Sequence, residues 1–500
     1  MRPIEPATSV ATREPTRDTD GMRTGMRPGI GARPRRRRAT LAATAGAAAL
    51  LGAAAWAQEA GEETGGLLAT LGVEIGAEHR DERDGEDETG LTGRLTFGLQ
   101  SITRSQSLTF SATGVYDLQD PEAESPFRPD ARLAYRAQTR QTVFDLGLTY
   151  AEREVDSLFP GEVLDLGDGL TDVDFDADDL EADEGTRRDA RLTLGLETGR
   201  AAPVGTRTTL AFRERRFDGT ANPDLADLSA RDLATTLFLR PREGLTFSVS
   251  ALRAESEEDD PEQTDQRVTR VGLGVEWTLS RAWSVAATAG AAEIRTTRTD
   301  GAGRDTDEET GLDLGLTVTR ALPRGPLTFV LSQEIDENGP RVETTVGRAL
   351  TFRDGSSLDG RIGAVAFEDG EIRTLLALDY ARPLPRGSLS LSLSRSGAVT
   401  DEGSDVVRTT GSASLRRDLT PVSALSLTGR LAAVDVVESA DPEDEDALRA
   451  EIGLSYSRAV TRDWSLTASA THQAEFEDGE RTDRANILSL GLSRSFAFRP

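Results

Sequence analysis

Apolar residues alternate with small or polar residues along most of the chain from Leu67 onward. Between Ser388 and Ser394, leucine and serine alternate without interruption. Between Val271 and Leu279, large apolar residues alternate with glycine, glutamate and threonine. Successive side chains of a strand point to opposite faces, so this pattern predicts strands with one apolar and one polar face. No helical period competes with it, and the chain is predicted to be all-β.

The polar face indicates where these strands lie. It carries Ser, Thr and Gly together with charged residues, which are the pore-lining candidates Glu74, Arg94, Arg132, Asp145, Glu197, Arg270, Glu276, Asp313 and Arg449. A soluble sandwich would pack large apolar side chains on both inner faces, whereas a small and charged face fits a water-filled interior with the leucine-rich face in lipid. A bilayer cannot satisfy open sheet edges, so the strands are predicted to close into an antiparallel transmembrane barrel. A long soluble β-repeat protein is the alternative.

The connections between strand-like runs support closure. We count about 22 runs, or 20 to 24 if one hairpin is merged or split. Every other connection is short and contains arginine, whereas the connections between them are acidic, as at 81–88 and 441–446. This alternation fits an even-stranded barrel with both termini on one side, short periplasmic turns and longer acidic extracellular loops.

The N-terminus has the features of an export signal. Arg35 to Arg38 precede an apolar run, and Ala55 and Ala57 supply small residues at both recognition positions of a signal-peptidase site. Residues 1–57 are therefore predicted to be a signal peptide, and a true start at Met22 or Met26 would give it an ordinary length. Residues 58–66 would form a short periplasmic segment before a barrel spanning 67–500, which leaves no room for a plug domain, so none is predicted.

Composition excludes several classes of function. The 58 basic and 86 acidic residues give a net charge of −28, and a pI near 4.6 argues against a nucleic-acid partner. Cysteine is absent, which removes thiolate chemistry. Alternation places the two histidines, His79 and His472, on the lipid face, roughly 10 Å apart from two strand spacings. No catalytic residue is assigned, and the protein is not predicted to be an enzyme.

The third outward loop, 152–189, is the longest and is acidic. Clustered carboxylates attract hard cations, so Asp172, Asp174, Asp176 and Asp178 are candidates for loosely bound calcium or magnesium. The run fails as a calcium hand because Ala177 stands where a turn glycine is needed and no glutamate closes the loop. No dedicated metal site and no cofactor are predicted.

The last segment, 487–498, alternates apolar residues and ends in Phe496 and Phe498. It resembles the C-terminal insertion signal of bacterial outer-membrane β-barrel proteins of the porin-like type, although Arg494 interrupts the apolar face and two residues follow Phe498. The resemblance implies location in the outer membrane of a Gram-negative bacterium, with outer-membrane lipid, lipopolysaccharide and the barrel-assembly machinery as partners. It also implies that loop 152–189 folds into the lumen as a constriction, and exposure of this loop on the cell surface is the alternative.

These features together predict a porin-like channel for passive diffusion of small polar solutes. The acidic loop would favour cations, because rings of charged side chains set the selectivity of such pores. A non-conducting structural or assembly barrel, for example an outer-membrane component of polysaccharide export, is the alternative, and an outer-membrane enzyme is the third possibility. The oligomeric state is not predicted.

Overall fold

The computed structural model describes residues 66–82, 88–118, 127–155, 185–220, 225–260, 263–299, 303–336, 339–367, 370–399, 405–438, 446–477 and 480–498. The predicted signal peptide, with Ala55 and Ala57, lies outside these residues. So do Asp172, Asp174, Asp176 and Asp178 of the third loop.

The described chain folds into 22 strands. Their bounds are β1 Leu67–Glu82, β2 Glu88–Ile102, β3 Gln106–Asp117, β4 Phe127–Gln138, β5 Thr142–Glu154, β6 Thr186–Thr198, β7 Val204–Asp218, β8 Leu228–Arg242, β9 Leu245–Glu258, β10 Asp265–Thr278, β11 Trp283–Thr299, β12 Arg304–Arg320, β13 Leu327–Asp336, β14 Gly339–Thr351, β15 Ser357–Ala366, β16 Ile372–Leu384, β17 Gly387–Val399, β18 Asp405–Thr420, β19 Ser423–Glu438, β20 Ala447–Ala459, β21 Trp464–Glu477 and β22 Glu480–Phe498.

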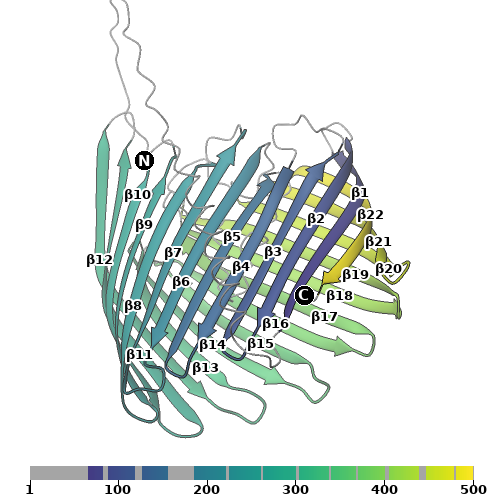
Figure 1. Ribbon diagram of the computed structural model, residues 1–500. Helices are drawn as coiled ribbons and strands as arrows, with labels where there is room; N and C mark the ends of the chain where they lie inside the picture. Colours follow the sequence, from purple (N-terminus) through teal and green to yellow (C-terminus); the bar gives the residue numbers. More distant parts are fainter. Residues whose placement is uncertain are drawn as a thin grey trace, which may run out of the picture. The chain divides into compact units, whose positions relative to one another are not determined.

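Each strand pairs antiparallel with its neighbour in the chain, and β1 pairs antiparallel with β22 from Ala69↔Phe498 to Glu82↔Ala485. This last pairing closes the sheet into a barrel (Figure 1). The predicted all-β, closed antiparallel barrel of about 22 strands is confirmed.

Many large apolar side chains are exposed, as in Leu273, Leu312 and Ile75 at 65%, 59% and 56% exposure. They occupy one side of the alternation, and the other side carries the polar residues. A water-soluble fold would hide these side chains, whereas a barrel in a bilayer places them against acyl chains. No helix in the described ranges is long and apolar enough to cross a membrane.

The third outward connection is shorter than predicted. Residues 152–154 belong to β5 and 186–189 belong to β6, so the connection begins at Val155 and not at Glu152. The ladder continues because opposite charges face each other across the hairpin: Nε of Arg188 lies 3.6 Å from Oε1 of Glu152. Cross-strand charged pairs thus extend the β5–β6 hairpin into a stretch where the sequence shows no apolar alternation.

The rim of the barrel is uneven. β12 pairs with β11 along its whole length, but it pairs with β13 only from Leu314 to Arg320. β13 and β15 are the shortest described strands, at 10 residues each. The end of the β13–β14 hairpin therefore leaves the plane of the wall, and it packs on the lumen side of β10 to β12.

Candidate functional site: the barrel lumen

The pairing registers place every pore-lining candidate on the face opposite the exposed apolar side chains. The candidates and a cross-strand partner on the same face are Glu74↔Arg94, Arg132↔Ser111, Asp145↔Arg136, Glu197↔Arg207, Arg270↔Ala292, Glu276↔Thr246, Asp313↔Gly290 and Arg449↔Glu475. Whether they line a conducting pore stays a prediction.

Two pairs of candidates meet. Nη1 of Arg94 lies 3.6 Å from Oε2 of Glu74, and Nε of Arg270 lies 3.4 Å from Oδ2 of Asp313. Four of the other five candidates pair with residues that the sequence did not single out: Arg132 with Asp130 at 3.5 Å, Asp145 with Arg136 at 3.5 Å, Glu197 with Arg207 at 3.3 Å, and Arg449 with Glu475 at 3.3 Å. The described part of the inner wall thus carries pairs of opposite charge, most of them between neighbouring strands.

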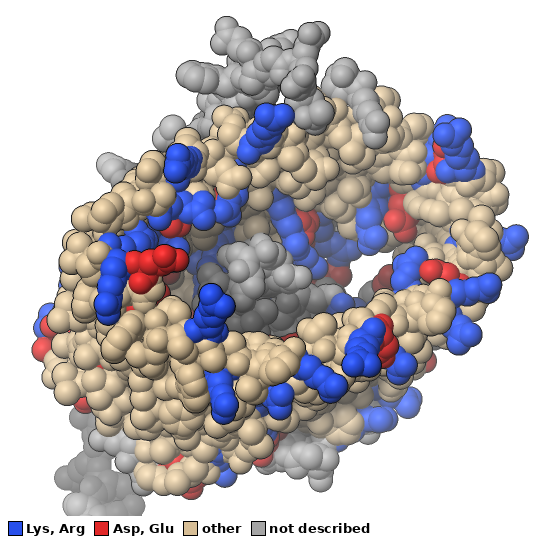
Figure 2. Space-filling view, turned by 90° about the horizontal axis from the view of Figure 1, so that it is seen from below, with Lys and Arg blue, Asp and Glu red and all other residues tan. Residues whose placement is uncertain are grey.

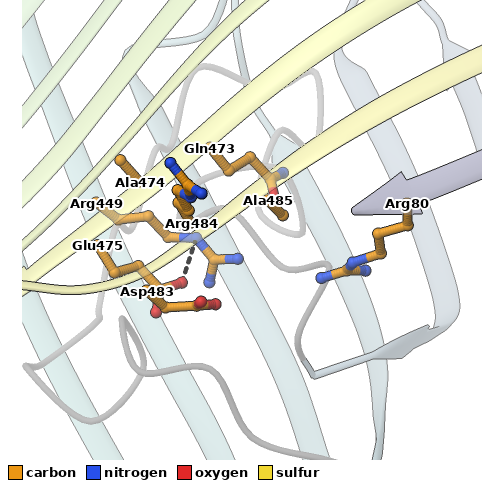
Figure 3. A pocket seen from close by; sticks show the side chains of 8 residues that line it. All are labelled: Arg80, Arg449, Gln473, Ala474, Glu475, Asp483, Arg484 and Ala485. Carbon is orange, nitrogen blue, oxygen red and sulfur yellow. Dashed lines mark ion pairs between the residues drawn. The ribbon is translucent and has the colours of Figure 1, made fainter. Parts of the chain in front are cut away.

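Arg449 and Glu475 form the most buried of these pairs, close to the seam where β22 meets β1 (Figure 3). Arg449 is 1% exposed and Glu475 is 7% exposed, although both side chains belong to the wall of a wide barrel. Arg80 of β1 lines the same small hollow. A buried charge needs a close partner, so this pair joins β20 firmly to β21 beside the seam.

Gln473 and Glu451 extend the polar network around this pair. Nε2 of Gln473 donates to Oε2 of Glu451 at 3.1 Å, and Nη1 of Arg430 lies 3.8 Å from Oε1 of Glu451. The network, which we call the seam cluster, comprises Arg430, Arg449, Glu451, Gln473 and Glu475. It spans β19, β20 and β21 on the lumen side.

The end of the β13–β14 hairpin is attached inside the lumen by Arg270 and Asp313. Nη2 of Arg270 donates to the carbonyl oxygen of Ile335 at 2.9 Å. The backbone N–H of Ile335 donates to Oδ1 of Asp313 at 3.1 Å. Because Arg270 and Asp313 also pair with each other, one ion pair satisfies both backbone groups of Ile335.

The side chain of Ile335 completes this attachment. It is 4% exposed and packs with Ala292 and Ile294 on the lumen face of β11. Gly311 on β12 allows the close approach, because a Cβ there would overlap the Ile335 side chain. Sequence alternation places Ile335 with Gln333 on the lipid face, so sequence reasoning missed this contact. Pro340, the second residue of β14 and the partner of Ile335, was the one signal of a departure from the wall.

Residues of β13 next to the attached hairpin end line a hollow on the inner wall. Arg270, Thr288, Asp313, Ser332 and Glu334 supply its polar lining. These groups offer hydrogen-bond donors, acceptors and both charges to a polar solute in the lumen.

Hydroxyl groups dominate another part of the wall. Cross-strand hydroxyl pairs join Ser390 to Ser414 at 2.7 Å, Ser465 to Ser493 at 2.7 Å and Ser469 to Ser489 at 2.5 Å. The lumen face of β17 from Ser388 to Ser396 carries serine and no charge. The inner surface therefore combines ion-paired and uncharged hydrogen-bonding regions.

The two histidines do not form a site together. Nδ1 of His79 contacts the Thr89 hydroxyl at 3.0 Å. Nδ1 of His472 lies 2.8 Å from Oδ1 of Asn486, whose amide nitrogen donates to Asp81 at 3.3 Å. His79 pairs with Leu488 across the seam. His472 pairs with Asn486, which lies two residues before Leu488 on β22. Within the described ranges no group of three His, Cys, Asp or Glu could hold a metal ion.

Phe496 and Phe498 lie on the lipid face beside the seam, paired with Leu71 and Ala69. Arg494, which interrupts the apolar pattern there, stacks over Phe496 at 4.6 Å and over Trp464 at 5.5 Å. Aromatic faces attract guanidinium groups, so the interruption is accommodated at the membrane boundary. The role of this segment as an insertion signal stays a prediction.

Comparison with known proteins shows which solved structures have a similar fold. No protein-family model and no curated protein matches the chain. Among solved structures, the ferric-catecholate import receptor Fiu from E. coli K12 is 8% identical, with a TM-score of 0.54 over 85% of this chain and 81% of its own. The siderophore receptor PirA from Acinetobacter baumannii is 9% identical, with a TM-score of 0.49 over 87% and 81%. The copper transporter OprC is 12% identical, with a TM-score of 0.48 over 85% and 80%.

The chain has the fold of a bacterial outer-membrane β-barrel. The prediction of a passive porin-like channel is contradicted by this comparison, because the similar barrel Fiu is named as an import receptor and not as a porin. The prediction that the barrel has no plug domain is not confirmed, because the comparison concerns the barrel fold alone. The similar structures are transport receptors and not enzymes.

Proposed function

We propose that this protein is an outer-membrane uptake barrel of the receptor type, which admits a bound solute through a lumen that is otherwise closed. The observation that carries the proposal is the ring of 22 strands closed by β1 and β22. An unfilled ring of this size would let small molecules leak through, and natural barrels of this size are filled.

The inner wall supports a filled lumen over a selective open pore. Its charges are compensated in cross-strand pairs such as Glu74–Arg94 and Arg270–Asp313. Selectivity by charge needs a ring of one sign at a constriction. Compensated charges and serine hydroxyls instead suit polar contacts with an element that occupies the lumen.

We propose a ferric catecholate as the first substrate to test, because Fiu is named as an import receptor for this class and shares the fold. The chain would be expressed in a host that lacks its own catecholate receptors but retains the system that energises them. Uptake of radioactive iron as a ferric catecholate would be measured with and without a protonophore. Boiled and unboiled gel mobility would establish that the barrel is folded.

We expect saturable iron uptake that the protonophore abolishes. Entry of nitrocefin, an unrelated β-lactam, should not rise above that of the empty host, because the resting lumen is closed. Uptake of nitrocefin in proportion to the amount of folded barrel would overturn the receptor proposal. Folded barrel without saturable uptake of the ferric catecholate would reject the substrate.

A further inference from the structure

A row of arginines follows the short-turn end of the barrel on its lipid-facing side. Every even-numbered strand from β12 to β22 contributes one near its end, and together they form the arginine belt: Arg320, Arg348, Arg382, Arg417, Arg458 and Arg494. Neighbouring strands are about 4.8 Å apart, so successive belt arginines are separated by about 10 Å. The row follows half of the strands of the barrel.

The pairing registers place the belt on the apolar face. Arg320 pairs with Trp283 and Leu327, both of which belong to that face. Leu415 and Leu492 are exposed, and they lie two residues before Arg417 and Arg494 on the same strands. The belt therefore marks the boundary where the apolar band ends at the short turns, the position at which long cationic side chains extend from a membrane into its headgroup region.

The charge of the belt is largely uncompensated by described protein groups. Arg382 lies 3.8 Å from the Asp354 carboxylate, with both side chains about half exposed. The remaining belt arginines form no ion pair with a carboxylate in the described ranges. Arg320 stacks over Trp283 at 5.2 Å, and Arg494 stacks over Trp464. Stacking fixes a guanidinium plane but leaves its N–H groups free for an acceptor.

At the short-turn end, an arginine on the lumen face is paired with a carboxylate, unlike most arginines of the belt. Arg416, next to Arg417 in the chain, points to the opposite face, and its Nε lies 3.5 Å from Oδ1 of Asp418. Figure 2, which looks at the short-turn end, shows far more basic than acidic side chains around this rim. The excess of positive charge at this end thus includes the arginine belt, which faces outward, toward lipid.

We propose that the arginine belt binds the phosphate groups of anionic phospholipids, of the phosphatidylglycerol class, in the leaflet next to the short turns. Guanidinium groups recognise phosphate oxygens with paired hydrogen bonds. The acyl chains of such a lipid would pack on the leucines next to the belt, including Leu415 and Leu492. An acidic protein is disfavoured as the occupant because it would have to approach sideways through the hydrocarbon boundary, whereas lipid already surrounds this face.

The test uses the full barrel in nanodiscs that contain equal amounts of phosphatidylglycerol and phosphatidylcholine. Lipids that stay bound after mild detergent extraction would be identified by native mass spectrometry. We expect wild type to retain phosphatidylglycerol in several-fold excess over its bulk proportion. The excess should decline as salt is raised, because added ions screen exposed charges.

The paired variants R417Q/R458Q and R361Q/R416Q each remove two arginines. The first pair belongs to the belt, and the second lies on the lumen face of β15 and β18. The belt variant should lose most of the enrichment and the lumen variant should keep it. R417K/R458K, which retains charge but not the paired hydrogen bonds, should show an intermediate enrichment.

Three results would overturn the proposal: no enrichment in wild type, equal loss in the belt and lumen variants, or enrichment that salt leaves unchanged. If lipids are not enriched but polyglutamate binds the solubilised barrel and R417Q/R458Q abolishes that binding, the belt is a protein-docking surface instead. Should R417Q/R458Q fail to fold, R417K/R458K takes its place in the comparison with the lumen variant, and equal enrichment in these two would overturn the proposal.

Discussion

Arg270 and Asp313 lie 3.4 Å apart on the lumen wall, and each also bonds to the backbone of the same residue, Ile335. One ion pair between β10 and β12 therefore holds the end of a hairpin formed by two other strands. Hydrogen bonds to charged groups contribute about 1.5–3 kcal/mol each, so the pair is strong enough to keep this hairpin end on the wall.

Asp313→Asn should release the hairpin end. The substitution weakens the acceptor for the Ile335 N–H and removes the charge that orients Arg270. We expect amide exchange in residues 327–336 to accelerate about tenfold or more, measured by hydrogen–deuterium exchange. Asp359→Asn, on the lumen face of β15, is the control and should leave that segment unchanged. Unchanged exchange in Asp313→Asn would show that the ion pair does not hold the hairpin.

Gly311→Ala should disturb the same contact by a steric route, because the added Cβ would overlap the Ile335 side chain. We expect faster exchange in residues 327–336 and a loss of about 1–3 kcal/mol in the stability of this contact. The double variant with Ile335→Ala should recover part of the loss, since the smaller side chain makes room for the Cβ. Gly429→Ala, where an added Cβ meets only a backbone oxygen at 3.8 Å, is the control. If the double variant is no better than Gly311→Ala, the overlap is not the cause.

Arg449→Met should destabilise the barrel strongly, because it leaves the Glu475 carboxylate buried without its arginine. Breaking a buried pair costs about 3–5 kcal/mol, which urea unfolding in detergent followed by circular dichroism would detect. Arg94→Met removes an arginine whose side chain is 51% exposed, and it should cost no more than about 1 kcal/mol. Adding Glu475→Gln to Arg449→Met should restore much of the stability. Equal losses at Arg449 and Arg94 would contradict the importance of burial.

Asp354, in the short turn between β14 and β15, should make the barrel sensitive to acid. The Ser356 hydroxyl and backbone N–H donate to its carboxylate at 2.6 and 3.1 Å and hold the pKa of Asp354 below its usual value. A lowered pKa in the folded state stabilises the fold above the unfolded pKa, and that stability is lost as the pH falls through the folded value.

The comparison is between wild type and Asp354→Asn. We expect wild type to unfold at higher urea concentration at pH 7, with the difference shrinking below pH of about 4, near the ordinary aspartate pKa. Ser356→Ala removes the hydroxyl that donates to the Asp354 carboxylate and should reduce the difference at pH 7. A difference that is the same at pH 7 and in acid would mean that the carboxylate charge is not involved.

The class of fold could be predicted from the sequence alone, because strand alternation is a local property. Each inward charge, from Glu74 to Arg449, could be assigned to its face by its position in a strand. The strand number and the sidedness of the connections followed from turn signals and charge. The predicted loop, 152–189, was too long. Glu152 and Arg188 are charged and look like loop residues in the sequence, but in the structure they belong to strands and pair with each other.

Which charges meet, and which residues leave the alternating pattern, could be seen only in the folded barrel. Arg449 and Glu475 are far less exposed than Arg94, yet all three have the same alternation in sequence. Ile335 turned from its expected lipid face to the lumen because β13 ends early against β12 and its hairpin end binds Arg270 and Asp313. Alternation assigns each side chain to a face of its strand from its neighbours in the chain. Its ion-pair partner, its burial and its contacts in the lumen depend instead on the register between strands that are distant in sequence. Closure of the ring determines that register.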